Sequence, residues 1–409
     1  MTRGTRRVVP LLSGVLVAVL LTGCTVGSSG PVRTSSAPAR TSAAPLATVS
    51  PTPSPSATPS GTSTPSIDAR AAELVERMTP DERAGQILMT AGTVPQLPGL
   101  AALVARYHLA GVMVRGRSSA GTAAVRQAFA PVQAAAPAGL PVLTATDQEG
   151  GLVQVLSGPG FSSIPSAVEQ GRGSAEETRA DAAKWGAELA NAGVRLDLAP
   201  VADVPCAAQL HDNPPIADLD RQYSADPAVA GAHVAAFVAG MHESGVDTAV
   251  KHFPGLGCVG ANTDTSAHVV DSATTADSAR LRSFDAGIGA GTAFVMVSSA
   301  EYALIDPGTP ALFSSRIMQG MLRGQLGFAG VVMSDDVGAA VAVRAWSPAQ
   351  RVTGFVRAGG DLMLDIEPGD VPAMHAALVA TAHEDAAFDA DLVAAATRVV
   401  AARLRLAAR

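Results

Sequence analysis

Two short segments place charged side chains directly after apolar, strand-like runs. One is Val-Lys-His-Phe-Pro-Gly at 250–255, which contains Lys251 and His252, and the other is Gly-Val-Val-Met-Ser-Asp-Asp at 330–336, which contains Asp335. A parallel barrel presents reactive groups in this way, at the carboxyl ends of its strands. A carboxylate there can attack a substrate, and a lysine and an imidazole can bind hydroxyl groups. The alternative is that Lys251 and Asp335 only form a buried ion pair.

The elements that would position these residues follow a regular alternation. Apolar, β-rich runs alternate with alanine-rich stretches, which predicts parallel strands joined by crossover helices. Eight such runs predict an α/β fold, a (β/α)8 TIM barrel forming a single catalytic domain. Asp226 followed by Pro227 marks one helix start. We expect strands at 86–89, 111–114, 141–147, 196–199, 248–252, 293–297, 330–335 and 361–364, and helices that include 175–191, 227–244, 278–290 and 314–326.

Several motifs in matching order resemble those of glycoside hydrolase family 3, in particular its single-domain β-N-acetylglucosaminidase branch and an exported lipoprotein member of it. The resemblance covers roughly residues 66 to 409. Ordered motifs at matching spacings are more specific than any one of them. They are Asp-Gln-Glu-Gly-Gly at 147–151, Leu-Ala-Pro-Val-Ala-Asp at 198–203, Asp-Arg-Gln-Tyr-Ser-Ala-Asp-Pro at 220–227, Lys-His-Phe-Pro-Gly at 251–255, Leu-Arg-Gly-Gln at 322–325, Gly-Val-Val-Met-Ser-Asp at 330–335 and Ala-Gly-Gly-Asp at 358–361.

The resemblance implies a retaining glycosidase with Asp335 as the nucleophile that forms a glycosyl-enzyme intermediate. It also implies that Asp147, Arg221, Lys251 and His252 bind the substrate. Other roles stay open from the residues alone. Asp335 could merely cap the next helix, Arg221 could form a surface salt bridge, and Asp147 could be structural. We expect the adjacent Asp336 to be structural, because it points to the other side of the strand.

The proton donor departs from the family pattern. That branch usually has a second His after Lys-His-Phe-Pro-Gly and then an Asp-Ser-His triplet whose His is the acid/base, but this chain has Leu256 and Asn-Thr-Asp at 262–264. Asp264 is therefore the acid/base candidate, because burial can raise the pKa of a carboxylic acid into a useful range. His268 is the runner-up, and Glu301 is a further carboxylate on the same face. About 45 residues follow the last predicted strand, so we expect the donor on a barrel loop.

These patterns favour a retaining exo-β-N-acetylglucosaminidase that removes terminal non-reducing GlcNAc from peptidoglycan-derived fragments. A β-glucosidase or a glycoside phosphorylase on the same fold is an alternative. A third is a catalytically silent lipoprotein that binds cell-wall sugars, since the family triplet is missing. Leu152 and Val155 stand where the family tends to have arginines, which leaves the saccharide preference open.

The amino terminus predicts export. A basic start with Arg3, Arg6 and Arg7 precedes a short apolar run, and Leu-Thr-Gly-Cys ends at Cys24, so residues 1–23 form a signal peptide and the sequence resembles a bacterial lipobox. The alternative is an ordinary signal with an incidental cysteine. Residues 24–65 are rich in Ser, Thr, Pro and Ala and form a disordered tether, and residues 66–409 are the catalytic domain. We expect a lipid anchor at Cys24 on the outer face of the cytoplasmic membrane, with some release to the cell wall left open.

Composition limits the binding partners and substrates that we expect. The net charge is −7 and no basic cluster lies outside the signal peptide, which excludes nucleic acid as an expected partner. Aromatic residues make up 4%, low for stacking on long polysaccharides, so we expect a small glycan or muropeptide substrate. We expect a monomer, with no cofactor and no metal. Cys206 and Cys258 form a disulfide candidate in an exported protein, or remain two separate thiols.

Overall fold

The computed structural model describes residues 65–136 and 139–409. The expected signal peptide, Cys24 and all but the last residue of the expected tether lie outside the described residues, so those three expectations remain predictions. The expected catalytic domain, 66–409, falls almost entirely within the described part of the chain.

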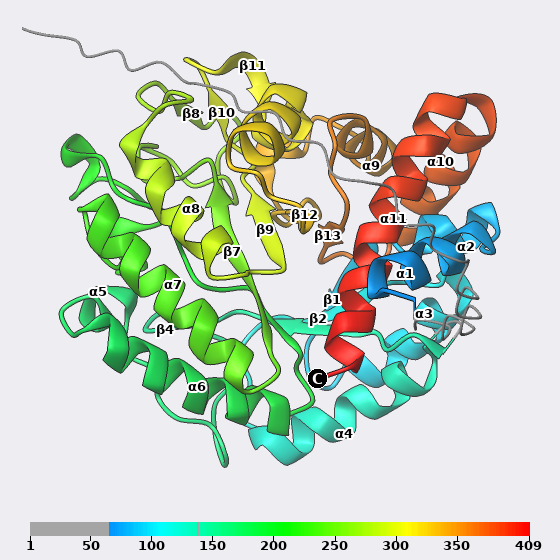
Figure 1. Cartoon of the computed structure of the whole chain (residues 1–409), viewed down its shortest axis with the longest axis horizontal. Coiled ribbons are helices and arrows are strands. Elements are labelled where there is room, and N and C mark those ends of the chain that lie inside the picture. Colours follow the sequence, from blue (N-terminus) through cyan, green and yellow to red (C-terminus); the bar gives the residue numbers. More distant parts are fainter. Residues whose placement is uncertain (1–64, 137–138) are drawn as a thin grey trace, which may run out of the picture. The chain divides into compact units, whose positions relative to one another are not determined.

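Eight parallel strands form a barrel, which confirms the predicted fold class (Figure 1). The order around the sheet is β12-β9-β7-β6-β3-β2-β1-β13, and a parallel bridge between Met333 and Leu362 joins its two ends. Each of the eight predicted strand regions overlaps one of these strands. They are β1 (Leu88–Gly92), β2 (Gly111–Val114), β3 (Leu143–Thr146), β6 (Leu196–Asp197), β7 (Asp247–Phe253), β9 (Phe294–Val297), β12 (Val331–Ser334) and β13 (Met363–Asp365).

One helix or more connects each pair of consecutive barrel strands, as a parallel arrangement requires. Figure 1 shows these helices around the outside of the strands, with α1 and α2 beside α10 and α11. The helices are α1 (Ile67–Glu76), α2 (Pro80–Gly85), α3 (Ala101–Tyr107), α4 (Gly121–Ala134), α5 (Ala167–Gln170), α6 (Ala175–Asn191), α7 (Pro227–Glu243), α8 (Arg282–Gly289), the π-helix η7 (Arg316–Gln325), α9 (Pro348–Arg357), α10 (Val371–Glu384) and α11 (Ala386–Ala407).

The first strand begins two residues later than predicted. Thr79 and Glu82 form a capping box that starts helix α2, and the backbone N–H of Gln86 still donates to the carbonyl of Glu82. Gln86 therefore ends the helix rather than starting the strand, and its side chain donates to the carbonyl of His108. A local capping signal outweighs the apolar run that follows it.

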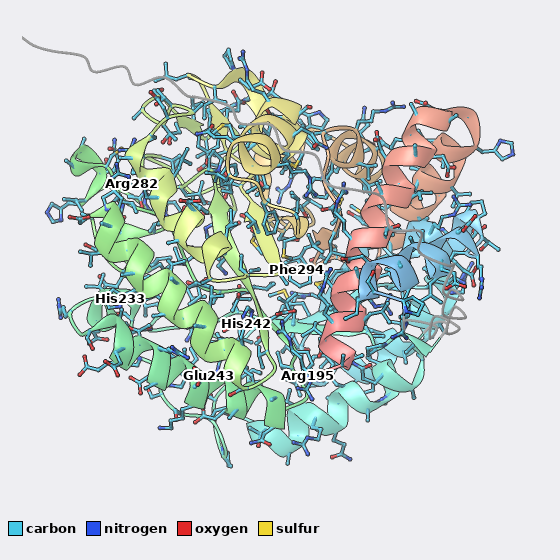
Figure 2. The ribbon with its side chains drawn as sticks, in the orientation of Figure 1. Arg195, His233, His242, Glu243, Arg282 and Phe294 are labelled. Carbon is cyan, nitrogen blue, oxygen red and sulfur yellow. A yellow bond between two sulfur atoms is a disulfide. The ribbon has the colours of Figure 1, made fainter. Side chains whose placement is uncertain are left out.

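The helices α6 and α7 show why the predicted boundaries hold. The Ser174 hydroxyl accepts from the N–H of Glu177 at the start of α6. Asp226 directly precedes α7, and its carboxylate accepts from the N–H groups of Ala228 and Val229 in the first turn of that helix. These side chains satisfy N–H groups that the first helical turn leaves without partners. His233 on α7 (Figure 2) lies 2.8 Å from the Thr178 hydroxyl of α6, so this buried imidazole has a structural partner.

Apolar side chains fill the barrel interior, so the barrel is a packed core and not a channel. Its inward-facing residues include Met89, Met113, Leu143, Phe294 and Met333, and residues of α11 join the same cluster. A chemical site can therefore lie only above the strand ends or between the loops.

Short strands and 3-10 helices lie in the loops that follow the barrel strands. The hairpin β4 (Gln148–Gly150) and β5 (Val153–Gln154) follows β3. A small sheet contains β8 (Val270–Asp271), β10 (Glu301–Tyr302) and β11 (Asp306–Pro310). The 3-10 helices are η1 (Leu97–Leu100), η3 (Ala207–Gln209), η4 (Ala217–Leu219), η5 (Ala279–Leu281), η6 (Ala311–Phe313) and η8 (Val341–Val343). In the described part of the chain, no helix has both the length and the apolar character needed to cross a membrane.

Candidate active site

The sequence-predicted residues gather in a cavity of about 450 Å³ at the carboxyl ends of the strands. Asp147 directly follows β3, and Asp335 directly follows β12. The barrel brings these strand ends to one edge although they lie far apart in the sequence. The charged residues that line the cavity are Arg115, Asp147, Glu149, Arg221, Lys251, Asp264, Asp335 and Asp336, together with His252.

A buried ion-pair cluster forms one wall of this cavity. Lys251 Nζ lies 2.6 Å from Asp147 Oδ1 and 2.6 Å from Glu149 Oε1. Arg221 donates to both Glu149 oxygens at 2.8 Å. The pairing of Lys251 with Asp335, an alternative from the sequence, is not the one the structure forms. Nor does Arg221 form a surface salt bridge, since its partner Glu149 is buried.

The cluster keeps its charges. Burial by itself would raise the pKa of Glu149, but the charges of Arg221 and Lys251 outweigh it and lower that pKa to about 2. Burial likewise opposes the charge on Lys251, but Asp147 and Glu149 hold the pKa of Lys251 above its ordinary value. At neutral pH the wall therefore presents fixed donors, which suits the binding of sugar hydroxyls.

A buried carboxylate orients His252. Asp203 Oδ2 lies 2.7 Å from His252 Nδ1, and Asp203 also accepts from the backbone N–H groups of His252 and Leu256. Nδ1 therefore faces Asp203, and Nε2 is the ring nitrogen left for other partners. That nitrogen lies 3.4 Å from Arg221 Nη2, at the cavity wall. Such a carboxylate fixes both the tautomer and the orientation of an imidazole.

Asp335 lines the cavity as a half-buried carboxylate. Its backbone N–H donates to Val297, and its Oδ1 accepts from the N–H of Asp336 at 2.9 Å. Burial raises the pKa of Asp335 to about 6, with a further upward contribution from the nearby Asp264 carboxylate, while His252 and Lys251 act against the rise. The group is ionised at neutral pH, as a nucleophile must be.

Asp336 has a different environment. Its carboxylate accepts from the backbone N–H groups of Gly338, Ala339 and Ile366 at 2.9, 3.0 and 2.9 Å. These bonds hold the turn after β12 in place, which fits the structural role predicted for Asp336. The expectation that Asp336 points to the other side of the strand is wrong, because it lines the same cavity as Asp335.

The structure separates the three proton-donor candidates. Asp264 lines the cavity and acts electrostatically on Asp335. Its side chain is exposed, however, so the burial expected of this acid/base candidate is not found, because the loop after β7 leaves the carboxylate at the surface, where it lines the cavity. His268 is exposed and does not line this cavity. Glu301 belongs to β10 and does not line it either. Of the three proton-donor candidates, Asp264 is therefore the one that shares the cavity with Asp335.

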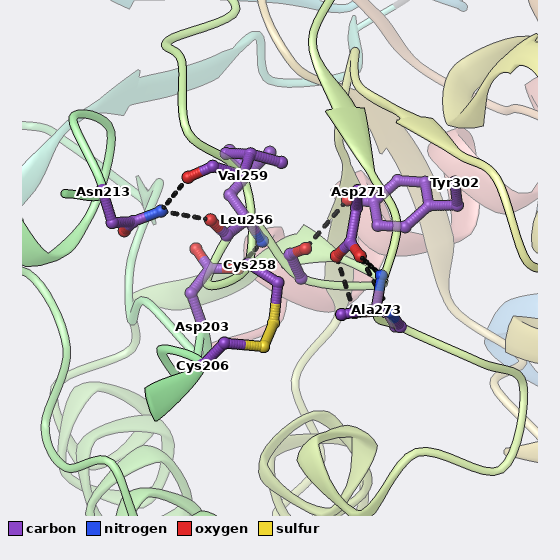
Figure 3. Close-up of a disulfide and its surroundings, with 11 residues drawn as sticks. Asp203, Cys206, Asn213, Leu256, Cys258, Val259, Asp271, Ala273 and Tyr302 are labelled. Carbon is purple, nitrogen blue, oxygen red and sulfur yellow. Dashed lines mark hydrogen bonds between the residues drawn. A yellow bond between two sulfur atoms is a disulfide. The ribbon is translucent and has the colours of Figure 1, made fainter. Parts of the chain in front are cut away.

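Two loops that carry site residues are joined to each other (Figure 3). Cys206, after β6, and Cys258, after β7, form a disulfide, which is the first of the two arrangements considered from the sequence. Asn213 is fully buried, and its Nδ2 donates to the carbonyls of Leu256 and Val259 at 2.9 and 2.8 Å. These contacts connect the loop of Arg221 with the loop of Asp264.

Sequence reasoning missed three residues of the site. Glu149 and Asp203 lie inside quoted motifs but received no role, because only the fold shows that they contact Arg221, Lys251 and His252. The third, Arg115, follows β2 and also lines the cavity. Its position directly after an apolar strand is the signal that could have found it.

Another cavity lies at the opposite ends of the strands. It has a volume of about 760 Å³, and its described lining residues include Pro141, Arg195 and Arg403 but no Asp or Glu. Acid/base chemistry of the predicted kind therefore belongs to the carboxyl-end cavity. Within the described ranges, no group of three or more His, Cys, Asp or Glu residues could hold a metal ion.

Known proteins share this architecture. Residues 79–402 match the family model "Glycosyl hydrolase family 3 N terminal domain". The crystal structure of a β-N-acetylhexosaminidase from Beutenbergia cavernae DSM 12333 is 48% identical, with a TM-score of 0.76 over 80% of this chain and 98% of that one. A β-N-acetylglucosaminidase from Paenibacillus sp. str. FPU-7 is 26% identical, with a TM-score of 0.73 over 81% of this chain and 63% of that one.

A sequence relative extends the agreement. The β-hexosaminidase of Stenotrophomonas maltophilia (strain K279a) is 36% identical over 277 residues, which are 66% of this chain and 79% of the relative. The match to the family model spans nearly all of the barrel, including every residue of the carboxyl-end cavity. The chain therefore belongs to glycosyl hydrolase family 3 and is a glycoside hydrolase.

Proposed function

We propose that this chain is a retaining exo-β-N-acetylglucosaminidase that removes terminal non-reducing GlcNAc from peptidoglycan-derived fragments. The observation that carries the proposal is that the Asp335 carboxylate lines one cavity together with the paired cations Lys251 and Arg221. A cavity of about 450 Å³ accommodates a terminal sugar better than the middle of a long polysaccharide. The names of the relatives from Beutenbergia and Paenibacillus support an N-acetylhexosamine as that sugar.

The proposed reaction has two displacements. In the first, an Asp335 oxygen forms a bond to the anomeric carbon while Asp264 donates its proton to the departing glycosidic oxygen, which leaves as an alcohol. In the second, Asp264 takes a proton from water, the water oxygen bonds to the anomeric carbon, and the bond to Asp335 breaks. Asp147, Arg221, Lys251 and His252 bind the sugar hydroxyls throughout, and Glu149 holds Arg221 and Lys251 in place. No cofactor or metal takes part.

Asp264 bears on the choice between hydrolysis and phosphorolysis. The second step of a phosphorylase requires phosphate to approach the site where water would otherwise attack. An exposed carboxylate beside that position repels the phosphate anion. We therefore infer hydrolysis rather than phosphorolysis.

The test is a panel of aryl β-glycosides of GlcNAc, glucose and xylose, assayed with and without phosphate. We expect the GlcNAc glycoside to react fastest, phosphate to leave the products unchanged, and a chelator to leave the rate unchanged. Preference for the glucoside would indicate a β-glucosidase, and a sugar phosphate product would indicate a phosphorylase. Binding without turnover of any glycoside would indicate a silent sugar-binding lipoprotein.

We also propose that the protein is exported and anchored through lipid on Cys24. The support is the basic start, short apolar run and Leu-Thr-Gly-Cys sequence at 21–24. Cys24→Ala should release the protein from the membrane, because signal cleavage alone leaves no attachment. Mass analysis of the wild-type protein should find lipid on the mature amino terminus. Firm membrane attachment of a protein without lipid would contradict the anchor.

A further inference from the structure

Arg115 is a cation of the active-site cavity without a partner among the described residues. It directly follows β2, is half-buried and lines the cavity. Across residues 65–136 and 139–409, no carboxylate oxygen lies within 4.0 Å of its guanidinium. Its Nε is buried without any hydrogen-bond partner. Buried polar atoms normally have a partner, so this group calls for one.

The other cations of the cavity are already occupied. Lys251 is paired with Asp147 and Glu149, and Arg221 is paired with Glu149 and the carbonyl of Pro215. Among the described residues, the other arginine and the lysine of this cavity are paired with carboxylates. A ligand can therefore approach the guanidinium of Arg115 without displacing a protein carboxylate. An anionic group placed elsewhere would meet Asp335 or Asp264.

The active-site cavity has a neighbouring cavity on one side. A second cavity of about 540 Å³ shares Val155 with the first one, so the two meet beside the β4–β5 hairpin. It offers polar contacts on the β2 and β3 side of the barrel, where a substrate longer than one sugar finds room. Its polar lining residues are Arg117, Ser118, Ser119, Gln154, Ser157, Ser162 and Ser163.

From these observations, and resting on the proposed function, we infer that Arg115 binds a carboxylate on the sugar next to the terminal GlcNAc. The substrate class is thus an acidic disaccharide or its longer derivatives, such as one carrying the lactyl carboxylate of muramic acid. A guanidinium presents paired donors that match a carboxylate. Arg115 also lines the cavity together with Val155, which stands where the family tends to have an arginine.

The test compares two disaccharides that have the same scissile bond. GlcNAc-β-1,4-MurNAc carries the lactyl carboxylate, and GlcNAc-β-1,4-GlcNAc is its neutral counterpart. Arg115→Gln should lower kcat/KM for the acidic disaccharide about tenfold or more, mainly through KM, because a charged hydrogen bond is lost. The neutral disaccharide should change by less than about threefold. Arg115→Lys should restore part of the preference.

A matched control removes the same charge elsewhere. Arg70 is exposed on α1 and lines neither cavity, so Arg70→Gln should leave both kcat/KM values unchanged. Raising the salt concentration should lower the ratio of kcat/KM for the acidic disaccharide to kcat/KM for the neutral one in the wild type. The same ratio should not change with salt in Arg115→Gln.

Two outcomes are distinguishable from failure of the proposed function. If the wild type cleaves both disaccharides and Arg115→Gln slows them equally, the inference is overturned while the proposed function stands. If the wild type cleaves neither, the proposed function fails, and calorimetric titration with free N-acetylmuramic acid and free GlcNAc decides the binding question. Tighter binding of the acidic sugar that Arg115→Gln abolishes supports the inference, and equal binding by both proteins overturns it.

Discussion

Glu149 and Arg221 form a bidentate ion pair, with both nitrogen–oxygen distances at 2.8 Å. The same carboxylate lies 2.6 Å from Lys251, so one buried anion holds a residue of strand β7 and a residue of the loop before α7. The position of the proposed sugar-binding wall therefore depends on a residue that need not touch the sugar.

Glu149→Gln should loosen that wall. It leaves Arg221 without a carboxylate and Lys251 with only Asp147, and breaking a buried pair in this way costs about 3 kcal/mol of unfolding free energy. We expect KM to rise more than kcat falls. Urea unfolding and steady-state kinetics measure the two effects, and Glu176→Gln on the exposed side of α6 is the control. Unchanged stability and KM would mean that the cluster has no organising role.

Asp335→Asn should abolish most activity while the fold and sugar binding persist, because the amide cannot form the glycosyl ester. A 2-fluoro sugar inactivator should label the wild-type protein at Asp335. Peptide mass spectrometry locates the label. A label on any other residue would refute the assignment of the nucleophile.

The pH profile should report the ionisation of Asp335. Its pKa is raised to about 6, so the carboxylate is ionised above that pH and protonated below it. For an activated aryl glycoside, kcat/KM should therefore fall as the pH drops through about 6. Glu149, with its pKa lowered to about 2, stays ionised over this range and does not contribute. A flat profile from about pH 7 to about pH 5 would contradict the raised pKa.

Asp264→Ala should slow glycosides with poor leaving groups far more than activated aryl glycosides, because only the former need a proton on the departing oxygen. The expected loss is on the order of a hundredfold or more. Azide should rescue the activated substrate and give a β-glycosyl azide, since a small anion replaces the water that Asp264 would deprotonate.

His268→Ala is the matched test for the other candidate, and we expect it to change little. If His268→Ala shows the leaving-group dependence and Asp264→Ala does not, the assignment of the donor is wrong. If neither shows it, Glu301 becomes the next carboxylate to replace.

Asn213→Asp should disturb the loop of Asp264 without removing any group from the cavity. The change replaces the Asn213 Nδ2 group, which donates to the carbonyls of Leu256 and Val259, by a carboxylate oxygen. This oxygen repels the two carbonyl oxygens. We expect about a tenfold loss for poor leaving groups and a smaller one for activated substrates. Asn191→Asp makes the same chemical change at an exposed position and should be neutral. Equal losses on both substrate types would indicate general destabilisation instead.

The sequence by itself determined the barrel. Strand and helix signals are local, since β-rich apolar runs, capping residues such as Asp226 and the Asp226-Pro227 start depend on neighbours along the chain. The strand regions were therefore predictable, and the first strand shifted because the Thr79 capping box extends a helix up to it. Charges that directly follow apolar runs likewise identified Asp147 and Asp335 as strand-end residues, because parallel strands share one carboxyl edge.

Only the tertiary structure decided the partners. Whether Lys251 pairs with Asp335 or with Glu149 depends on the directions of side chains from different strands, which no spacing along the chain encodes. The same holds for the choice of Asp264 over His268, since four residues of loop can point to the cavity or away from it. Arg115 has no partner among the described residues for a related reason. A missing contact is a property of three-dimensional surroundings, and the strand that carries Arg115 looks like any other in the sequence.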